Sequence, residues 1–228
     1  MASFDPAAMA GAERPYLFTN FAVTVDGHAT LDGRSGAIGS DTDTALLMAL
    51  RESAEAVMIG AGTMRVERYG RILPGEDRRL RRERAGLAPD PLTVLVSNRF
   101  DLPWDAGLFT CGFGEVLVFT ASDERAPRTA TEVEVIRHPG GVDLSAAMRH
   151  LRRERGIRGL LCEGGPRLHG DLLGAGLIDE LFVTLGSKLT GGGGPRLAEG
   201  LAEQPIEVEL RWLLEEDSEL YARYAIRS

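Results

Sequence analysis

Residues 159–166 read GLLCEGGP, a short apolar run that ends in a glutamate, two glycines and a proline. An uninterrupted apolar run of this kind is typical of a strand in a parallel sheet, where both faces are covered. Proline is favoured at the first position of a helix, because the N–H that it lacks would have no partner there. The stretch therefore predicts a buried strand, a glycine turn, and a helix that begins at Pro166 and ends near Gly174 or Gly176.

The same alternation of strand and helix extends along most of the chain. Apolar and β-branched runs predict strands at residues 16–25, 56–60, 92–97, 116–120, 133–138, 159–163, 179–187, 208–214 and 219–228. Helices are predicted from Ser40 to about Ser53, over 143–156 with Asp143 as the cap, and weakly over 121–131. This alternation indicates an α/β fold with a largely parallel sheet, whose last two strands, which no helix separates, should pair antiparallel at one edge.

The bulk composition suits one soluble globular domain. The chain has 228 residues, of which 43% are hydrophobic and 26% are charged. We expect residues 15–228 to form that domain, after a disordered tail at residues 1–14. A net charge of −8 argues against a nucleic-acid-binding surface, which needs a basic face. Two isolated cysteines, no signal-peptide pattern and no apolar stretch long enough to span a bilayer indicate a cytoplasmic protein with no membrane partner.

Two glycine breaks follow predicted strands, Gly60-Ala61-Gly62-Thr63 and Gly164-Gly165-Pro166. In open α/β sheets, ligands bind beyond the carboxyl ends of the strands, and backbone N–H groups at the start of a helix favour a phosphate. Neither break has the complete G-x-G-x-x-G pattern of a Rossmann fold. A tight turn without a ligand would have the same sequence, but two such breaks in one small domain favour a dinucleotide site.

Other constellations of reactive residues are missing from the sequence. The four histidines show no metal-ligand spacing, so we expect no metal, and His150 and His169 are expected on helix surfaces. The charged run over 75–90 indicates a solvated helix or loop with its arginines on the surface. The glycine-rich segment 188–197 indicates a mobile loop. A site for an anionic cofactor is therefore the function that the residues themselves favour.

Several short motifs occur in the order typical of one family. Thr24-Val25-Asp26-Gly27 is similar to its S-L-D-G, and Leu50-Arg51 followed by residues 56–63 is similar to its L-R…A-I-x-V-G-x-G-T. Glu163-Gly164-Gly165-Pro166 matches its E-G-G-P, and Asp179-Glu180-Leu181 matches its D-E-L. Over residues 15–226 the chain thus resembles the reductase domain of the bifunctional deaminase/reductase of riboflavin biosynthesis. That family implies a dihydrofolate-reductase-like three-layer sandwich, with a mostly parallel central sheet and an antiparallel C-terminal edge.

The resemblance implies NADPH as the cofactor. Its residues would be Gly60, Ala61, Gly62 and Thr63 at the phosphates, and Gly164, Gly165 and Pro166 along the pyrophosphate and nicotinamide. In such enzymes the Gly-Gly peptide is often cis. Ser97 follows the third strand, where this superfamily contacts the adenosine 2′-phosphate, and Arg99 is a plausible partner because its guanidinium suits a phosphate. A surface arginine without a ligand is an equally fair interpretation of Arg99.

On the substrate side the resemblance is less complete. It implies that Glu163 accepts hydrogen bonds from a pyrimidine or pterin, with Asn20, Asp26 and Glu67 on the same side. The family usually has Lys at the position of Asn20, and D-N-P or D-D-P where this chain has Glu67-Arg68-Tyr69. Glu163 could instead be an acid that stabilises the N-terminus of a helix.

Asp43 occupies the place of another substrate carboxylate. In dihydrofolate reductases a carboxylate on the helix after the first strand holds the pterin, about one helix before the glycine loop. Asp43 lies on the predicted helix after the first strand, before Gly60. A helix cap or a surface carboxylate would have the same sequence context. The comparison therefore adds Asp43 to the candidates for substrate binding and catalysis.

The resemblance implies an NADPH-dependent reductase, with Asp43 and Glu163 as the candidate catalytic residues. Its expected acceptor is 5-amino-6-(5-phosphoribosylamino)uracil, the pyrimidine of riboflavin biosynthesis. Asn20, Asp43 and Glu67 favour dihydrofolate as an alternative acceptor. A non-catalytic relative that only binds NADPH is the third interpretation. By analogy with similar reductases, we also expect a homodimer.

Overall fold

The computed structural model describes residues 4–201 and 205–227. Its contacts divide the chain into two compact units, each built from two separate segments. Unit 1 comprises Met1–Tyr16 and Ala49–Leu161, and unit 2 comprises Leu17–Met48 and Cys162–Ser228. The sequence predicted one domain over residues 15–228, and that assignment stays a prediction.

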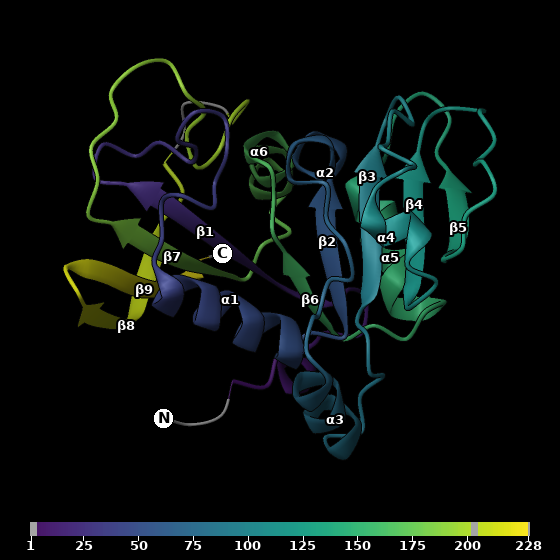
Figure 1. The fold of residues 1–228 in the computed structure, drawn as a ribbon, viewed down its shortest axis with the longest axis horizontal. Helices are drawn as coiled ribbons and strands as arrows, with labels where there is room; N and C mark the ends of the chain where they lie inside the picture. The colour runs from purple at the N-terminus through teal and green to yellow at the C-terminus, as the bar shows by residue number, and fades with distance from the viewer. Residues whose placement is uncertain (1–3, 202–204, 228) are drawn as a thin grey trace. The chain divides into compact units, whose positions relative to one another are not determined.

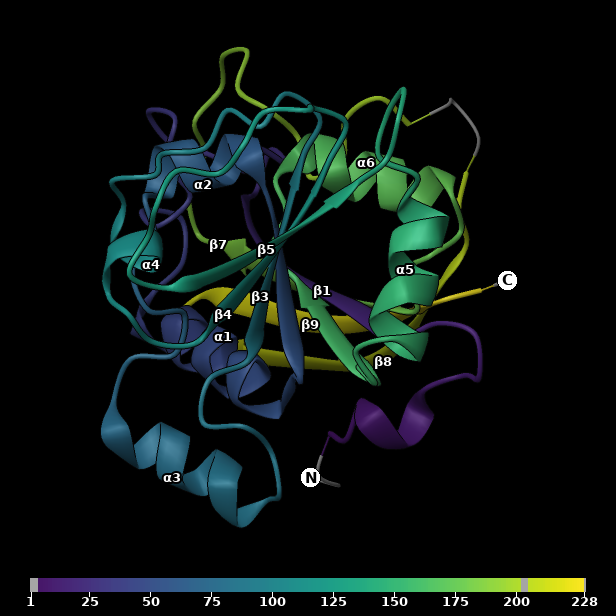
Figure 2. The same ribbon diagram turned by 90° about the vertical axis from the view of Figure 1, so that its right-hand side faces the viewer.

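Unit 1 contains a parallel arrangement of short, buried strands. The strand order is β5-β4-β3-β2-β6, and β2, β3, β4 and β5 pair in parallel. Figure 2 shows β3, β4 and β5 crossing in a fan, which is the twist expected of such strands. The strands are β2 (Ala56–Gly60), β3 (Leu92–Ser97), β4 (Glu115–Thr120), β5 (Glu132–Arg137) and β6 (Gly159–Cys162).

The helices of unit 1 follow its strands closely. They are α2 (Ala61–Glu67), α3 (Glu76–Arg84), α4 (Gly107–Thr110) and α5 (Leu144–Arg153). Asp143 caps α5 as predicted, because its carboxylate accepts the Ala146 N–H at 2.9 Å. The weak helix predicted over 121–131 is wrong, since most of that segment is irregular and strand β5 begins at Glu132. Pro127 interrupts the segment, and the Ser122 hydroxyl accepts the Glu124 N–H in a local turn.

Arg82 on α3 is buried, although the basic run to which it belongs was expected on the surface. It is 1% exposed, and its Nη1 donates to the carbonyls of Arg51, Glu52 and Ala54 at 2.6–3.1 Å. These carbonyls lie at the C-terminal end of α1 (Asp41–Ser53), where backbone acceptors have no partner within the helix. The run EDRRLRRER therefore contains one structural arginine, which its charge pattern does not distinguish from its neighbours.

Of the disordered tail expected for residues 1–14, residues 1–3 lie outside the described residues, and the structure describes residues 4–14 as part of unit 1. Residues Ala7–Met9 form a short 3-10 helix, η1. A Cβ on Gly159 would lie 2.9 Å from Pro6 Cγ, and Arg152 Nε donates to the Gly11 carbonyl at 3.0 Å. The absence of a side chain on Gly159 thus allows the N-terminal segment to pack closely on β6. The composition of the segment did not indicate this packing.

Unit 2 is built on a mixed sheet in the order β1-β7-β9-β8. Its strands are β1 (Tyr16–Thr24), β7 (Glu180–Gly186), β8 (Val208–Glu216) and β9 (Glu219–Ile226). β1 and β7 are parallel, whereas β9 is antiparallel to both β7 and β8. Figure 1 shows β9 between β7 and the edge strand β8. The predicted antiparallel C-terminal edge is thereby confirmed.

Helices lie on both faces of the unit 2 sheet. The helix α6 (Pro166–Gly174) covers one face, where His169 meets Thr19 and Phe21 of β1. The first turns of α1 cover the other face, where Asp43 lies beside Thr184 of β7. Alternate residues of a strand point to opposite faces, which explains why β1 is buried on both. Unit 2 therefore has the three layers that the sequence predicted.

The segment 188–197 was expected to be mobile, but the structure fixes it to unit 2 at several points. The His28 ring bonds to the Gly194 carbonyl at 3.0 Å, and the Ala29 N–H donates to the Pro195 carbonyl at 2.8 Å. Arg196 Nη1 donates to the Asp26 carbonyl at 2.6 Å. These partners lie far away in the sequence, so the glycine content alone could not indicate them, and the mobility of the segment stays a prediction.

Within residues 4–201 and 205–227, no helix has the length and apolar character that a membrane span requires. The same residues contain no cluster of histidine, cysteine and acidic side chains that could hold a metal ion. Cys111 and Cys162 are both free thiols.

Candidate functional site

The first glycine turn lies in unit 1, at the carboxyl end of β2. Gly60 is the last residue of β2, and α2 begins at the next residue, Ala61. Gly62 is exposed, and the nearest atom to a Cβ placed on it would be Arg65 Nη2 at 4.0 Å. Thr63 is half-buried in the same turn. The turn therefore leaves open space above its backbone, which a phosphate could approach.

Ser97 lies beside this turn, at the end of the neighbouring strand. Gly60 pairs with Val96 in the register of β2 and β3, so Ser97 is one residue further along the adjacent strand. Arg99 follows in the loop and its side chain is exposed. From α2, Arg65 Nη1 donates to the Asp101 carbonyl at 2.9 Å in that same loop. The predicted phosphate residues of unit 1 thus lie together at the carboxyl ends of β2 and β3. The two arginines of this region are Arg65 and Arg99.

Glu67 is the last residue of α2 and is half-buried. Arg68 ends the helix in a left-handed conformation with φ 48°, and its guanidinium pairs with Asp105 at 2.6 Å. At the position of the family's D-N-P, this chain therefore has Glu67 at the end of α2, followed by Arg68 in an ion pair with Asp105.

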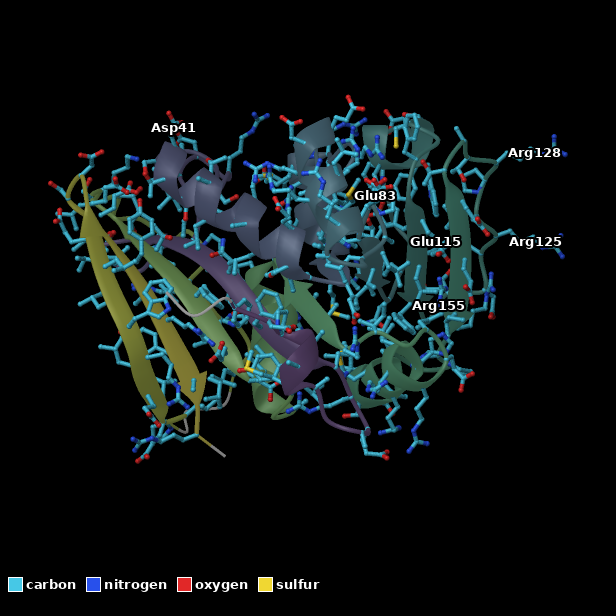
Figure 3. All side chains as sticks on the ribbon, turned by 90° about the horizontal axis from the view of Figure 1, so that it is seen from below. Asp41, Glu83, Glu115, Arg125, Arg128 and Arg155 are labelled. Atoms are coloured by element: carbon cyan, nitrogen blue, oxygen red, sulfur yellow. The ribbon has the colours of Figure 1, made fainter. Side chains whose placement is uncertain are left out.

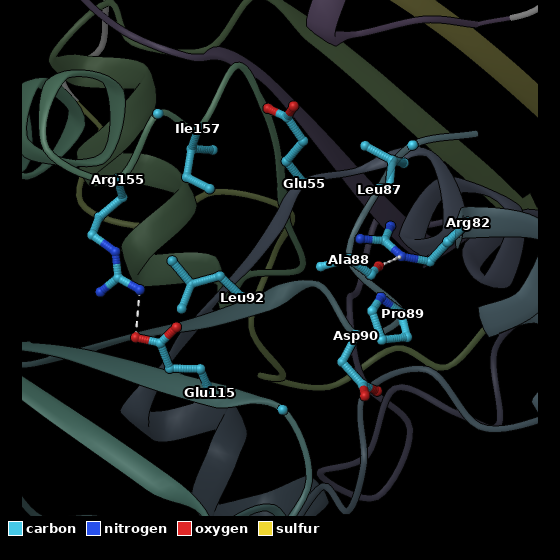
Figure 4. A pocket seen from close by; sticks show the side chains of 13 residues that line it. Glu55, Arg82, Leu87, Ala88, Pro89, Asp90, Leu92, Glu115, Arg155 and Ile157 are labelled. Carbon is cyan, nitrogen blue, oxygen red and sulfur yellow. Dashed lines mark hydrogen bonds and ion pairs between the residues drawn. The ribbon is translucent and has the colours of Figure 1, made fainter. Parts of the chain in front are cut away.

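A cavity of unit 1 lies at the opposite ends of the strands. It has a volume of about 450 Å³, and Figure 4 shows Glu115 and Arg155 paired at one side and Arg82 at the other. None of the predicted site residues lines it. Its carboxylates are already engaged, since Glu55 pairs with Arg158, Glu115 with Arg155, and Asp90 with Arg71. The cavity is therefore not the site that the sequence predicted.

The second glycine turn lies in unit 2, between β6 and α6. The Gly164–Gly165 peptide is cis, as the resemblance implied. Gly164 is buried with φ +91°, a backbone conformation that side-chain-bearing residues rarely adopt. A Cβ on Gly164 would lie 2.7 Å from Phe21 Cζ, so the residue must be glycine for steric reasons as well. Glu163, directly before this turn, is half-buried.

His169 supports this turn from below and is fully buried, although the sequence placed it on a helix surface. Its ring packs on Phe21 at a centroid distance of 4.4 Å. Nδ1 must donate to the Leu197 carbonyl at 2.9 Å, so Nε2 of the neutral ring can accept from the Thr19 hydroxyl at 3.4 Å. Burial lowers the pKa of His169 to about 4. The neutral ring therefore contacts both segment 188–197 and Phe21, and Phe21 in turn contacts the glycine turn.

Three buried polar atoms of unit 2 have no hydrogen bond of ordinary geometry with a described residue, although the Thr184 hydroxyl lies close enough to the Asp43 carboxylate to oppose the rise of its pKa. They are Asn20 Oδ1, Asp43 Oδ1 and Thr184 Oγ1. Phe18 packs on Phe182, which shows that these residues share a face of the sheet, and alternation places Asn20 and Thr184 on that same face. Buried polar atoms without partners are uncommon and call for an explanation. A ligand that carries N–H groups would supply one.

Asp43 belongs to the first turn of α1, and polar groups surround its carboxylate. Burial raises the pKa of Asp43, the Thr184 hydroxyl opposes that rise, and the Glu219 carboxylate adds to it. Glu219 accepts hydrogen bonds from Tyr221 at 2.7 Å and from Ser40 at 2.8 Å. Asp41, on the same turn, projects outward instead (Figure 3). Among the acids of the first turn, Asp43 is thus the one directed at the sheet.

Asp26 has a structural set of partners. Its carboxylate accepts from the Thr24 hydroxyl at 2.6 Å and from the Gly191 N–H at 2.7 Å. These hydrogen bonds, that of Thr24 first, hold the pKa of Asp26 well below its usual range. The carboxylate therefore fixes segment 188–197 to the end of β1.

Sequence reasoning missed three residues that shape unit 2. Thr184 is one threonine in an alternating strand, and Phe21 is one of several apolar residues in β1. His169 follows Pro166 by one helical turn, which is the only sequence signal that relates it to the glycine turn. None of the three stands out without the partners that the fold brings to it.

The sequence also matches known proteins. Residues 15–219 match the family described as the RibD C-terminal domain. A protein of Archaeoglobus fulgidus, named 2,5-diamino-6-ribosylamino-4(3H)-pyrimidinone 5′-phosphate reductase, is 30% identical over 187 residues, which cover 78% of this chain and 83% of the relative. A protein of the same name from Methanothermobacter thermautotrophicus is 28% identical, over 94% of this chain and 99% of the relative.

Solved structures confirm the fold. A pyrimidine reductase-like protein from Corynebacterium diphtheriae superposes with a TM-score of 0.81 at 21% identity, over 99% of this chain and 100% of the other. Dihydrofolate reductase from Enterococcus faecalis gives a TM-score of 0.51 at 11% identity, over 93% and 97%. The predicted dihydrofolate-reductase-like fold is therefore confirmed. Because the family match extends over residues 15–219, the chain belongs to the RibD C-terminal domain family.

Proposed function

We propose that this chain is an NADPH-dependent reductase that acts on a phosphoribosylamino-pyrimidine of riboflavin biosynthesis. The observation that carries the proposal is the alignment with a reductase of that name over nearly its full length. Two further observations support it. The family's E-G-G-P is retained at the second glycine turn. In addition, Asn20 Oδ1 and Asp43 Oδ1 in unit 2 are buried acceptors that a ligand with N–H groups could satisfy.

Membership of a reductase family on this fold implies a nicotinamide cofactor, and the residues present fit one. Apart from its chain neighbours and its own helix backbone, the nearest atom to a Cβ added at Gly62 would be Arg65 Nη2 at 4.0 Å, which supports an open approach for a phosphate. Ser97 and the exposed Arg99 could hold a 2′-phosphate, which favours NADPH over NADH. Gly164, Gly165 and Pro166 of unit 2 remain proposed cofactor contacts, as the resemblance implies. The chemistry that this cofactor supplies is a hydride.

The pyrimidine would be held by the polar atoms of unit 2. Asn20 Oδ1 and Asp43 Oδ1 can accept from ring N–H and amino groups, and the Thr184 hydroxyl can donate or accept. Pairing these atoms would remove the cost of burying them unsatisfied, about 1–3 kcal/mol each. Glu163 lies directly before the glycine turn and is proposed as a further acceptor, and Glu67 of unit 1 remains a proposed substrate contact.

The reaction needs a hydride and a proton. The ribosylamino ring would open to a C=N bond at its anomeric carbon; a hydride on that carbon and a proton on the nitrogen would then give the ribitylamino product. Asp43 is proposed to deliver that proton, because its carboxyl group is directed at the sheet beside other buried polar atoms and burial raises its pKa. The other residues orient the acceptor, which is a proximity effect.

Dihydrofolate is a second candidate acceptor, and Asp43 is the observation that favours it. Its carboxyl group faces the sheet from the helix after β1, at the place where dihydrofolate reductases hold the pterin. The same atoms would then bind a pterin edge in place of a pyrimidine edge.

A panel of acceptors tests these proposals. The purified chain is mixed with NADPH or NADH and with one of three acceptors: the 2,5-diamino-pyrimidinone phosphate, 5-amino-6-(5-phosphoribosylamino)uracil, or dihydrofolate. We expect oxidation of NADPH with one of the two pyrimidines, slower oxidation of NADH, and at least a hundredfold lower activity for Asp43→Asn. Turnover of dihydrofolate alone would select the second candidate. Calorimetric binding of NADPH without turnover of any acceptor would identify a non-catalytic relative.

A further inference from the structure

Glu219, at the start of β9, is a carboxylate buried in unit 2. It is 3% exposed, and its Oε2 accepts hydrogen bonds from the Tyr221 hydroxyl at 2.7 Å and from the Ser40 hydroxyl at 2.8 Å. The Ser40 N–H donates to the same oxygen at 3.3 Å. Glutamate is rarely buried to this extent, because removing a charge from water is costly unless other groups compensate. A glutamine would fill the same space without that cost, which points to a role for the charge itself.

The register of the sheet places Glu219 on the face that Asp43 covers. Tyr221 of β9 lies directly opposite Thr184 of β7, so these two side chains point to the same face. Glu219 precedes Tyr221 by two residues and therefore points to that face as well. Asp43 lies beside Thr184 from α1, and its charge also acts on Tyr221. Asp43, Thr184, Tyr221 and Glu219 thus form one polar group between α1 and the sheet, which we call the carboxylate cluster.

Ser40 connects this cluster to the start of α1. It immediately precedes the helix, and its hydroxyl oxygen accepts the Thr42 N–H at 3.2 Å. Serine is a favoured residue at this capping position. A Cβ on the preceding residue, Gly39, would collide with Oδ2 of Asp43, so the carboxyl group of Asp43 lies against the backbone of this turn. By holding Ser40, Glu219 therefore holds the turn on which Asp43 rests.

We propose that Glu219 is a positioning residue for Asp43, which it keeps protonated and directed at the sheet until the substrate takes the proton. The inference rests on the proposed function, in which Asp43 delivers that proton. Two carboxyl groups in one buried cluster do not both carry a charge readily, because like charges repel strongly where water is excluded. The group that receives the hydrogen-bond donors keeps the negative charge, and its neighbour keeps the proton.

The donors of the cluster are distributed in this way. The hydroxyl groups of Ser40 and Tyr221 both point at Glu219. Asp43 Oδ1, in contrast, has no hydrogen bond of ordinary geometry with a described residue. The geometry therefore assigns the charge to Glu219 and the proton to Asp43.

The charges around the cluster support the same assignment. Burial opposes the ionisation of Glu219, but the hydrogen bonds that it accepts and the charge of Lys188 outweigh burial, so the pKa of Glu219 is lowered. Lys188 is held nearby, since its Nζ donates to the Ile38 carbonyl at 2.8 Å. Burial raises the pKa of Asp43, the Thr184 hydroxyl opposes that rise, and the Glu219 carboxylate adds to it. The two pKa values thus move in opposite directions, as expected of an acid and its anionic neighbour.

A further carboxylate, on β8, faces Glu219 from the solvent side. Glu216 lies directly opposite Glu219 in the register of β8 and β9, and its side chain is exposed. Water screens a charge in that position, so it should act only weakly on Asp43. Glu216→Gln removes one negative charge from the same hairpin and leaves the partners of Glu219 in place, which makes it a matched control.

Carbon-13 NMR of labelled side-chain carboxyl groups tests the proposal without any turnover. In the wild type we expect Glu219 to lose its proton at a lower pH than Asp43, and the opposite order would overturn the proposal. Glu219→Gln should lower the titration midpoint of Asp43 by about one pH unit, because the neighbouring charge is gone. Glu216→Gln should leave that midpoint in place. An Asp43 midpoint that is the same in the wild type and in Glu219→Gln would equally overturn the proposal.

Tyr221→Phe separates the charge of Glu219 from its hydrogen bonds. The variant removes one donor but leaves the carboxylate, with Ser40 still bound to it. Because the charge remains, we expect the midpoint of Asp43 to stay near its wild-type value. A midpoint as low as that of Glu219→Gln would show that any disturbance of the cluster has the same effect, and would refute the role of the charge.

The pH profile of kcat/KM connects the cluster to catalysis. An acid that donates a proton is active only below its own pKa, so activity falls as the pH rises through that value. Glu219→Gln should move this fall to lower pH by the shift that NMR measures, and kcat/KM well below that pH should approach the wild-type value. A lowered Asp43 midpoint with an unmoved pH profile would overturn Asp43 as the proton donor. Lack of turnover in the wild type would count against the proposed function alone, because the NMR titration does not depend on it.

Discussion

Phe21 lies directly beneath Gly164, at a distance that leaves no space for a side chain on the glycine. A Cβ added to Gly164 would be 2.7 Å from Phe21 Cζ, and the φ of +91° is unfavourable for any other residue. We expect Gly164→Ala to destabilise the protein by about 1–3 kcal/mol and to weaken NADPH binding at least tenfold. Thermal unfolding and calorimetry measure the two effects. Gly193→Ala is the control, because nothing lies within 4 Å of a Cβ there.

The clash between these two residues should also appear as a coupling. If the Phe21 ring is what excludes a side chain at Gly164, removing the ring must make Gly164→Ala less costly. We expect Phe21→Ala alone to cost about 3–5 kcal/mol through the cavity that it leaves. The double variant should be more stable than the sum of the single effects predicts, by about 0.5–3 kcal/mol. Strict additivity in urea unfolding would show that backbone strain alone governs Gly164.

His169 should make the stability of unit 2 depend on acidity. Its folded pKa of about 4 lies below the ordinary value of 6.5, so the unfolded state binds the proton more readily. The contribution of neutral His169 to the free energy of unfolding is then fully present above pH 6.5, and it is lost as the pH is lowered from 6.5 to about 4. His169→Gln should flatten that part of the profile. Urea unfolding at several pH values measures the slopes, and parallel profiles for wild type and His169→Gln would contradict this expectation.

Asp43 should contribute to activity at the expense of stability. Its folded pKa is raised by burial, so the folded state holds the proton more tightly and stability decreases as pH rises through that window. We expect Asp43→Asn to melt at a higher temperature than wild type at neutral pH, and the gain to vanish in acid. Reductase activity should fall at the same time. Asp41→Asn, on the same helical turn but exposed, should change neither property noticeably, and a variant D43N that is both less stable and fully active would refute the assignment.

Arg82 should stabilise the C-terminal end of α1 through its hydrogen bonds to the carbonyls there. Its guanidinium donates to three carbonyls that have no other partner within the helix, so Arg82→Met leaves them buried and unsatisfied. We expect a loss of roughly 3 kcal/mol in the free energy of unfolding. Arg84→Met, on the same helix but exposed, is the control and should cost less than about 0.5 kcal/mol. Equal losses for both would mean that helix propensity, not capping, is responsible.

Much of the fold could be predicted because its signals are local. The apolar runs at 56–60 and 92–97 gave their strands to the residue, and Asp143 gave the start of its helix. Pro166 marked the beginning of α6. The short helix α4 was missed because four residues show no periodicity. The helix expected over 121–131 failed because weak propensity could not outweigh Pro127 and the turn at Ser122.

The candidate site was predictable only where a residue type is dictated by backbone geometry. The Gly164–Gly165 turn could be recognised from the family's E-G-G-P, and the structure shows why Gly164 must be glycine. His169 could not, because burial depends on Phe21 and Leu197, which come from β1 and from segment 188–197. For Asp26, the sequence indicated a substrate contact, whereas its present partners are Thr24 and Gly191. The chemistry of a side chain can be read from the sequence, but its partners depend on the tertiary fold.

The interrupted course of the chain through unit 2 affects how the protein is made. β1 emerges early from the ribosome, yet its parallel partner β7 begins about 160 residues later, as the bond from Leu17 to Asp179 shows. All strands of unit 1 have been translated before β7 appears. During that interval the edge of β1 that pairs with β7 stays open, and such unpaired segments are prone to aggregate or to engage chaperones. A nascent chain stalled near residue 162 should therefore be the species most dependent on chaperones.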